Sequence, residues 1–432
     1  MKRIYPIHLF LLAMLSAALV LQAGCANGSD AASTTRNTVS PIESVQTDAE
    51  ILNAIAATEQ NPDAVNAYTN LAAIYIRKAR ANGDFSLNDK AKSAVEKALE
   101  LDAKDLNARR LNASLLSTLH RFPEARESAL ALTKEFSADA FSYGVLTDAN
   151  VELGNYDEAL AAAQKMVDLK PNSSSYARVA HLRSLYGEHK GAVEVYKLAA
   201  KTADPADKEA QSWCLVQLGN EYWKYGKYKE AESVYDEALQ VFPQSYMAMA
   251  GKGRTLASQG QYESAIKYLN DSMNRVPNAD IAILLSEIYS KLGRQSEAEQ
   301  QAALVEVIDK KLGKSGDQRR LAMFWADRGM NLQETLEIAQ REAASRNDIF
   351  TADTLAWALY KNGKIPEAAE AIKKAMRLKT NDAGIYYHAG MIEKASGNER
   401  EAKRLLELSL KTNPNFDLIQ SEIAKQTLEA MK

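Results

Sequence analysis

Residues 212–245 read SWCLVQLGNEYWKYGKYKEAESVYDEALQVFPQS, and the spacing of apolar and small residues in this segment predicts two helices. Its first half spaces Leu218, Gly219 and Tyr222 at i, i+1 and i+4, which places them on one face of a helix. Gly226 follows, and glycine tolerates the left-handed conformation in which many helices end. The stretch therefore begins with a helix that stops at a tight turn.

A second helix is expected after that turn. Ala231, Tyr235 and Ala238 recur at i, i+4 and i+7 and so share one face. The small side chain of Ala231 lets the second helix approach the first closely. Pro243 ends the unit because proline cannot continue a helix interior. The resulting hairpin cannot bury its own apolar face, so it needs neighbours of the same kind.

The chain supplies such neighbours as internal repeats. A small residue returns in the same local context at intervals of 33 to 39 residues, at Ala91, Ala125, Ala159, Ala192, Ala231, Ala265, Ala298, Thr335, Ala368 and Ala402. Most copies also carry a turn glycine five residues before this position. We therefore expect one repeated helical hairpin to fill the chain from about residue 65 to residue 414.

This pattern resembles the tetratricopeptide repeat (TPR), in which two antiparallel helices form each unit of 34 residues. The resemblance implies an all-α fold, a right-handed α-solenoid of about ten repeats with a terminal capping helix. The expected solenoid spans 47–432, with repeats at 64–104, 106–139, 140–172, 173–206, 212–245, 246–278, 279–312, 316–348, 349–382 and 383–414 and the cap at 415–432. The stretch TADTLAWALY at 351–360 looks like a widespread group of bacterial TPR proteins that has no single activity to transfer.

The N-terminal segment 1–24 has the pattern of a secretory signal peptide. Lys2 and Arg3 form a basic head, and residues 7–21 are apolar except at two positions. The end of the segment, LQAGC, resembles the lipobox of bacterial lipoproteins. This resemblance implies cleavage before Cys25 and lipidation of that cysteine.

Residues 25–46 are expected to be the lipidated cysteine and a flexible tether, because the segment is polar and lacks apolar periodicity. Ala26 follows the cysteine, and the lipoprotein family retains proteins at the inner membrane when Asp stands there. The resemblance therefore implies a membrane-anchored lipoprotein of the bacterial cell envelope, at the outer membrane and facing the periplasm. Two alternatives stay open: an uncleaved helical anchor over residues 4–24, and ordinary soluble secretion.

Composition excludes several classes of protein. The 432 residues hold 53 Lys and Arg against 56 Asp and Glu, a net charge of −3, which lacks the basic excess that nucleic-acid binding needs. Two cysteines exclude a disulfide scaffold, and the five histidines have no metal-ligand spacing. We expect structural roles for His120, which replaces a turn glycine, and for Cys214, a small apolar residue within a helix. Because no catalytic constellation is present, we expect no enzyme, no cofactor and no metal site.

Candidate partner-binding residues follow from the resemblance, since the first helix of each TPR hairpin lines a concave groove. Transferred to this sequence, they are Trp213, Asn220 and Trp223 in the fifth repeat, Phe350, Trp357 and Tyr360 in the ninth, and Tyr387 in the tenth. Exposed aromatic residues supply contact area at low entropic cost. The alternative is that these aromatic residues pack between repeats as part of the core.

The function that this pattern favours is a membrane-tethered envelope scaffold. It would bind a protein or peptide partner through the TPR groove, with no role for nucleic acid, and take part in assembling an envelope complex. One alternative is a structural subunit that docks through its convex surface or its ends. Another is a regulatory arm of a cell-wall or export enzyme.

Overall fold

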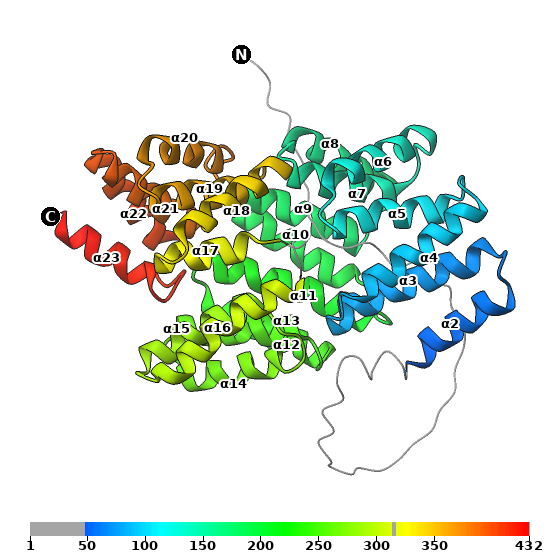
Figure 1. Cartoon of the computed structure of the whole chain (residues 1–432), viewed down its shortest axis with the longest axis horizontal. Helices are drawn as coiled ribbons and strands as arrows, with labels where there is room; N and C mark the ends of the chain where they lie inside the picture. Colours follow the sequence, from blue (N-terminus) through cyan, green and yellow to red (C-terminus); the bar gives the residue numbers. More distant parts are fainter. Residues whose placement is uncertain (1–47, 313–316, 432) are drawn as a thin grey trace, which may run out of the picture. The chain divides into compact units, whose positions relative to one another are not determined.

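The computed structural model describes residues 48–312 and 317–431 (Figure 1). The described residues form helices α2 to α23 and contain no strand, which confirms the predicted all-α solenoid class. They divide into two compact units, an N-terminal unit whose described part is 48–118 and a C-terminal unit that begins at residue 119. The predicted signal peptide, Cys25 and the tether up to residue 46 lie outside the described residues.

The N-terminal unit consists of α2 (Ala49–Gln60), α3 (Val65–Asn82), α4 (Leu87–Leu101) and α5 (Leu106–Thr118). Helix α2 is capped by Asp48, whose carboxylate accepts the backbone N–H of Glu50 at 3.0 Å and also pairs with Lys78 at 2.5 Å. Its buried Ile51 joins the apolar cluster of α3 and α4. Helix α2 therefore covers an end of the α3–α4 hairpin that would otherwise lack a neighbour.

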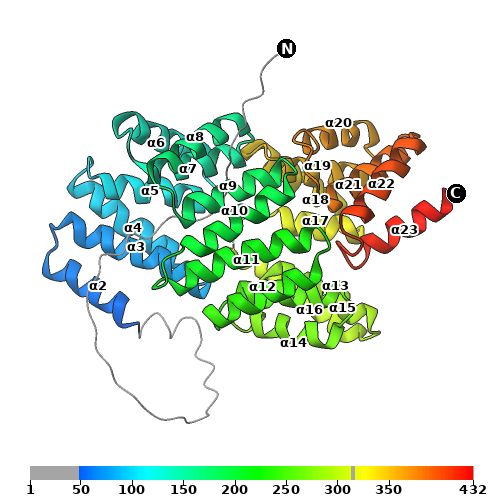
Figure 2. The same cartoon turned by 180° about the vertical axis from the view of Figure 1, so that it is seen from behind.

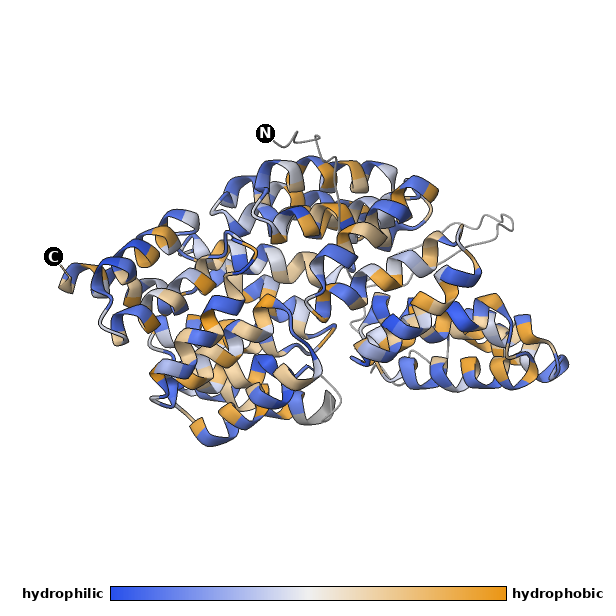
Figure 3. Ribbon diagram, turned by 90° about the horizontal axis from the view of Figure 1, so that it is seen from above, coloured by the Kyte–Doolittle hydropathy of each residue, from blue (hydrophilic) through white to orange (hydrophobic). Residues whose placement is uncertain are grey.

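The C-terminal unit holds the remaining helices in chain order. They are α6 (Phe122–Glu135), α7 (Ala140–Glu152), α8 (Tyr156–Leu169), α9 (Ser173–Leu185), α10 (His189–Thr202), α11 (Lys208–Lys224), α12 (Tyr228–Val241), α13 (Tyr246–Ser258), α14 (Tyr262–Met273), α15 (Ala279–Lys291), α16 (Gln295–Leu312), α17 (Arg319–Arg328), α18 (Leu332–Ser345), α19 (Ile349–Lys361), α20 (Ile365–Ala375), α21 (Ala383–Ala395), α22 (Glu399–Thr412) and α23 (Gln420–Ala430). Consecutive helices pack as hairpins, for example α11 with α12 and α21 with α22. Figure 3 shows hydrophobic and hydrophilic residues alternating around these helices, as expected where each helix buries one side.

The boundary between the two units falls within the expected repeat 106–139, between α5 and α6. His120 stands just after this boundary and has a left-handed backbone, with φ of 57°. In the equivalent turn of the fifth hairpin, Gly226 has φ of 66°. Because left-handed backbone is strained for residues with a Cβ atom, His120 fills its turn less easily than glycine does.

The C-terminal unit also folds back on itself. Asn347, in the loop before α19, donates its backbone N–H to the carbonyl oxygen of Glu152 at 3.1 Å. Ile349 donates its N–H to the Tyr156 hydroxyl at 3.0 Å, and a Cβ atom at Gly154 would overlap the Asn347 carbonyl. The end of α7 and the start of α8 are thus joined to the loop before α19 and to the first residue of that helix. Figures 1 and 2 show the chain from opposite sides.

Three asparagine side chains continue this line of contacts. Asn381 donates to the Gly187 carbonyl at 3.1 Å, Asn413 to the Trp223 carbonyl at 2.9 Å and Asn415 to the Ser258 carbonyl at 2.8 Å. We call this line the seam: it joins the hairpin turns that follow α7, α9, α11 and α13 to the loops that precede α19, α21 and α23. The expected capping helix over 415–432 begins only at Gln420, because Asn415 and its neighbours form part of the seam instead.

A buried group of charges lies at one end of the seam. The Arg346 side chain is 1% exposed, and its Nη1 lies 3.2 Å from Glu152 Oε2. Its Nη2 lies 2.7 Å from Asp317 Oδ1 and 2.7 Å from Glu342 Oε2. These carboxylates offset the free-energy cost of burying the Arg346 charge. Removing one of the partners would leave buried charge without a counter-charge.

Candidate functional site

A cavity of about 200 Å³ opens between α11, α13 and α15 in the C-terminal unit. Its lining includes apolar Val216, Ala250 and Leu284 and polar Gln217, Asn220 and Arg254. All six come from the first helices of successive hairpins, which are the helices expected to line a groove. Because small-molecule sites usually hold roughly 300–1,000 Å³, the cavity fits one side chain of a peptide better than a cofactor.

Arg254 is held in one position at the edge of this cavity. Its Nη2 donates to Asn220 Oδ1 at 2.7 Å, and its guanidinium carbon lies 3.9 Å from the centre of the Trp223 ring. Trp223 is itself fixed, because its indole Nε1 donates to the Ser258 hydroxyl at 2.9 Å. Among the described residues the buried Arg254 Nε has no hydrogen-bond partner. The contacts with Asn220 and Trp223 therefore hold the guanidinium in one orientation at the cavity edge.

The position of Asn220 depends on a tyrosine from the second helix of the hairpin. Tyr235 is fully buried, and its hydroxyl donates to Asn220 Oδ1 at 2.8 Å. Its ring passes between two glycines: a Cβ atom at Gly219 would lie 2.6 Å from the ring, and one at Gly251 would also overlap it. Small residues were expected to allow close helix packing, and here they also let a hydroxyl reach the cavity wall.

Two of the predicted residues meet at Arg254. Asn220 and Trp223 both contact Arg254, as expected from their spacing on one helix face. Trp213, predicted on the same exposed face, is only 8% exposed. The expectation of exposure is wrong for Trp213, because this side chain packs within the helix layers. Cys214 is buried as expected.

The predicted aromatic residues of α19 and α21 lie mostly in the core. Trp357 and Tyr387 are each 2% exposed, so their predicted exposure in a groove is wrong. Trp357 stacks on Tyr360 at 4.8 Å between ring centroids and on His388 at 4.2 Å. His388 comes from the next hairpin and binds Asp353 through Nδ1 at 2.9 Å. These rings therefore pack between repeats, which is the alternative that the sequence left open.

Phe350 and Tyr360 differ from this buried pair. Phe350 is 37% exposed near the start of α19, and Tyr360 is partly buried. Phe350 is thus the candidate aromatic residue of α19 with the largest share of surface open to a partner.

Two further carboxylates, Glu287 and Asp327, lie on α15 and α17. Glu287 lies one turn beyond Leu284 on α15 and is buried, with Arg328 Nη2 3.9 Å away. Burial raises the pKa of Glu287 well above its ordinary value, and the nearby charges of Asp417 and Asp327 raise it further. Asp327 on α17 accepts hydrogen bonds from Trp357 Nε1 at 2.7 Å and from Gln420 Nε2 at 2.6 Å.

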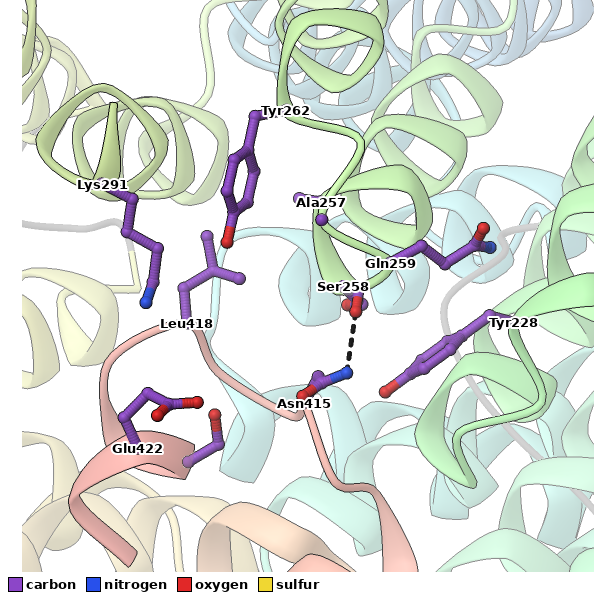
Figure 4. A pocket seen from close by; sticks show the side chains of 11 residues that line it. Tyr228, Ala257, Ser258, Gln259, Tyr262, Lys291, Asn415, Leu418 and Glu422 are labelled. Carbon is purple, nitrogen blue, oxygen red and sulfur yellow. Dashed lines mark hydrogen bonds between the residues drawn. The ribbon is translucent and has the colours of Figure 1, made fainter. Parts of the chain in front are cut away.

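A second pocket, of about 480 Å³, borders the segment that leads into α23 (Figure 4). Tyr262 and Lys291 line one side, and Leu418 and Glu422 line the opposite side (Figure 4). The dashed line in Figure 4 is the seam contact from Asn415 to Ser258. The pocket is therefore a gap between the hairpins and the chain's own C-terminal segment.

Two features are absent from the parts of the chain that the structure describes. No helix within 48–312 and 317–431 is long and apolar enough to cross a membrane. Within the same ranges, no group of three or more His, Cys, Asp or Glu side chains could hold a metal ion.

Comparison with known proteins identifies the repeats. Family profiles described as tetratricopeptide repeat match residues 110–174, 216–280 and 383–416. The chain contains tetratricopeptide repeats. The match over 216–280 includes the second half of α11 and all of α13, so it covers most of the cavity wall. Repeats of this kind bind protein partners and are typical of non-enzymatic interaction proteins.

Curated relatives of the TPR chain share only part of their length with it. Human "Protein O-mannosyl-transferase TMTC1" is 27% identical over 245 residues, which are 56% of this chain and 23% of that protein. The Drosophila melanogaster "BBSome complex member BBS4 homolog" is 26% identical over 176 residues, or 38% of this chain and 36% of that protein. The chain thus spans about a quarter to a third of the length of these relatives.

Similar solved structures include bacterial and human proteins. A tetratricopeptide repeat protein from Parabacteroides merdae has 20% identity, a TM-score of 0.35, and covers 64% of this chain and 99% of its own. PilW, a type IV pilus biogenesis factor, has 19% identity and a TM-score of 0.38, with 48% and 95% covered. Human IFIT1 has 14% identity and a TM-score of 0.44, with 84% and 94% covered.

Sequence reasoning missed Arg254, although a signal was present. Arg254 lies 34 residues after Asn220, at the equivalent position of the next repeat. Residues at equivalent positions of neighbouring hairpins lie side by side on the first helices. The contact between Asn220 and Arg254 could therefore have been predicted from their spacing. The contact of Gln420 with Asp327 had no such signal, because it depends on how the chain folds back.

Proposed function

We propose that this TPR protein is a membrane-tethered scaffold of the bacterial cell envelope that holds a segment of a partner protein in the Arg254 cavity. Its role would be in the assembly of an envelope complex. Asn220 and Trp223 fix the Arg254 guanidinium beside an apolar cavity of about 200 Å³. This observation carries the proposal, because a fixed cation next to an apolar recess matches a peptide that presents a side chain and a backbone or carboxylate oxygen.

Affinity capture tests the role of the cavity. The full chain and its Arg254→Ala variant serve as baits in detergent-solubilised envelope of the native host, and mass spectrometry identifies what is bound. Arg404→Ala is the matched control, because Arg404 is an exposed cation that pairs with Glu401 on its own helix. We expect a protein that the wild type and the control recover equally and that Arg254→Ala recovers roughly tenfold less, as for an arginine at the centre of an interface.

Equal recovery by all three baits would contradict binding through the cavity. It would favour docking through the convex surface or the ends of the unit.

The membrane tether is a separate proposal that rests on the sequence pattern around Cys25. We expect the wild-type protein to incorporate a fatty-acid label and to fractionate with outer membranes, and Cys25→Ala to do neither. A Cys25→Ala variant that stays in the membrane would instead indicate an uncleaved helical anchor. A soluble and unlabelled wild type would indicate ordinary secretion.

A further inference from the structure

Two contacts of the seam reach the helices that form the Arg254 cavity. Asn413 Nδ2 donates to the carbonyl oxygen of Trp223 at 2.9 Å, and Asn415 Nδ2 donates to that of Ser258 at 2.8 Å. Trp223 lies in the last turn of α11, and Ser258 is the last residue of α13. The last carbonyl groups of a helix have no partner within it, so groups from outside satisfy them. The segment that follows α22 therefore caps two first helices of the cavity.

The two residues that accept these hydrogen bonds also hold Arg254. The centre of the Trp223 ring lies 3.9 Å from the guanidinium carbon, and the indole nitrogen donates to the Ser258 hydroxyl at 2.9 Å. That hydroxyl donates in turn to the backbone carbonyl of Arg254 at 3.1 Å. A continuous line of hydrogen bonds and one stacked pair thus runs from the two asparagines to the cation at the cavity edge.

The asparagines are fixed by the segment in which they lie. Pro414 packs against the turn at Gly226, where a Cβ atom would lie 3.2 Å from the proline ring. The backbone N–H of Asn415 donates to Asn413 Oδ1 at 3.1 Å, which joins the two side chains. Leu418 is 7% exposed and belongs to the apolar cluster of α13, α14 and α15. The contacts with α11 and α13 therefore depend on how the whole segment between α22 and α23 is docked.

Helix α23, which follows the segment, is packed on one side only. Ile419, just before the helix, is 41% exposed, and Ile423 is 37% exposed, while Ala424 is fully buried. Regions with few buried apolar contacts open locally at a lower free-energy cost than the core does. This end of the C-terminal unit is therefore able to open while the first helices of the cavity stay folded.

We propose that Asn413 and Asn415 are positioning residues for the Arg254 cavity, and that docking of residues 413–431 keeps the cavity in the form that binds a partner. This inference rests on the proposed function and adds its regulation. When the segment detaches, two helix-end carbonyl groups lose a donor, and the indole that stacks on the guanidinium loses its fixed position. A partner in the cavity and the docked segment therefore favour each other, because coupling between two sites is reciprocal.

The position of Trp223 can be followed in the full chain without a partner. The chain has four tryptophans, so labelling with fluorotryptophan gives four signals in fluorine NMR, and Trp223→Phe assigns its own. Asn415→Leu keeps the shape of the side chain, removes the donor and adds no charge. We expect it to shift the Trp223 signal. The signal of Trp213, in the first half of the same helix, should stay in place because the helix remains folded.

Asn362→Leu is the matched control for the loss of an asparagine donor. Asn362, at the end of α19, donates through Nδ2 to the carbonyl oxygen of Leu332 on α18 at 2.9 Å. It makes the same kind of contact between two helices, but neither of them lines the Arg254 cavity. This variant should leave the Trp223 signal unchanged.

Leu418→Ala tests the docking of the segment itself. It removes apolar contacts with α13, α14 and α15 and leaves both asparagines in the chain. We expect the Trp223 signal to shift in the same direction as in Asn415→Leu, because both changes release the same contacts. If Leu418→Ala does not fold, as judged by circular dichroism, the Asn415→Leu variant decides alone.

Photo-crosslinking in the native host measures the effect on binding, with a photoreactive residue at Met247 in the cavity. Asn415→Leu and Leu418→Ala should each lower the yield of the crosslinked product by at least roughly fivefold, and Asn362→Leu should not change it. An unchanged Trp223 signal, or an unchanged yield despite a shifted signal, would overturn the inference and leave the proposed function standing. A wild type that gives no product would contradict the proposed function instead, and the Trp223 signal would then decide whether the asparagines position the cavity.

Discussion

At the scale of single residues, Tyr235 determines the wall of the cavity. Its ring fits between Gly219 and Gly251, and its hydroxyl orients Asn220, which in turn holds Arg254. A buried hydroxyl with a partner is stabilising, whereas the same group without one would be costly. The two glycines are therefore part of the candidate site although neither contacts a partner.

Gly251→Ala is expected to destabilise the C-terminal unit by about 1–3 kcal/mol, because the new Cβ atom would overlap the Tyr235 ring. Urea unfolding followed by circular dichroism measures this change. Gly384→Ala in α21 is the control: its nearest neighbour is a side-chain oxygen of Asp382 at 3.3 Å, so we expect no loss of stability. Equal stability of the two variants would contradict this account of Tyr235.

Residue types predicted the local structure well. The turn at Gly226 and the close approach at Gly219 both follow from side-chain size and backbone freedom. The exposure of side chains was harder to predict. Trp357 and Trp223 occupy similar positions on first helices, yet Trp357 stacks on His388 whereas Trp223 contacts Arg254. Trp357 is covered by His388 of the next hairpin, which sequence spacing does not reveal.

Among the helices, α19 is a first helix that buries some of its aromatic side chains in the core and exposes another to solvent. Trp357 is stacked between Tyr360 and His388, and its indole nitrogen donates to Asp327. Phe350, two turns earlier, remains 37% exposed. The same helix therefore joins two hairpins through Trp357, while the Phe350 side chain stays partly in solvent.

Trp357→Ala is expected to lower the free energy of unfolding by about 3–5 kcal/mol, since it empties a buried site. Phe350→Ala should lower it by less than about 1 kcal/mol, because its ring is partly in solvent already. Chemical denaturation of both variants gives the comparison. Similar losses for both would show that Phe350 also packs in the core.

The end of the chain illustrates a limit of element prediction. The repeat pattern predicts a helix over 415–432, yet α23 begins at Gln420. Pro414 cannot continue α22, and the Asp417 carboxylate caps a helix that starts after it. Both residues are visible in the sequence and indicate that the helix starts later. The apolar residues between 415 and 420 led to the prediction of a continuous helix instead.

At the scale of the whole C-terminal unit, the seam joins hairpins that are far apart in sequence. Its contacts link residues about 190 positions apart, such as Asn413 with Trp223 and Asn381 with Gly187. A repeat pattern predicts that neighbours stack, but the pitch of a solenoid depends on small rotations added over many repeats. The seam could therefore not be predicted, whereas the solenoid could.

The buried charges of the seam predict a dependence on pH. Burial, followed by the charge of Asp348, raises the pKa of Glu152 to about 7, against the opposing charges of Arg319 and Arg346. The folded state thus binds this proton more tightly than the unfolded state, in which the ordinary value of 4.5 applies. The stabilisation is fully present below pH 4.5 and is lost as the pH rises through about 7.

Glu152→Gln removes this dependence. Relative to the wild type, its free energy of unfolding should rise by about 1 kcal/mol between pH 6 and pH 8. Denaturation at several pH values measures the difference, and Glu158→Gln, an exposed change on α8, should show none. A difference that is constant over this range would contradict the raised pKa of Glu152.

A partner segment held in the Arg254 cavity would lie against the first helices that line it. Site-specific photo-crosslinking in the native host tests this most directly, with a photoreactive residue at Met247 in the cavity or at Ser233 on the exposed side of α12. We predict a discrete crosslinked product from Met247 that is absent from Ser233 and is lost when Arg254→Ala is added. A product from Ser233 alone, or one from Met247 that persists with Arg254→Ala, would contradict the account.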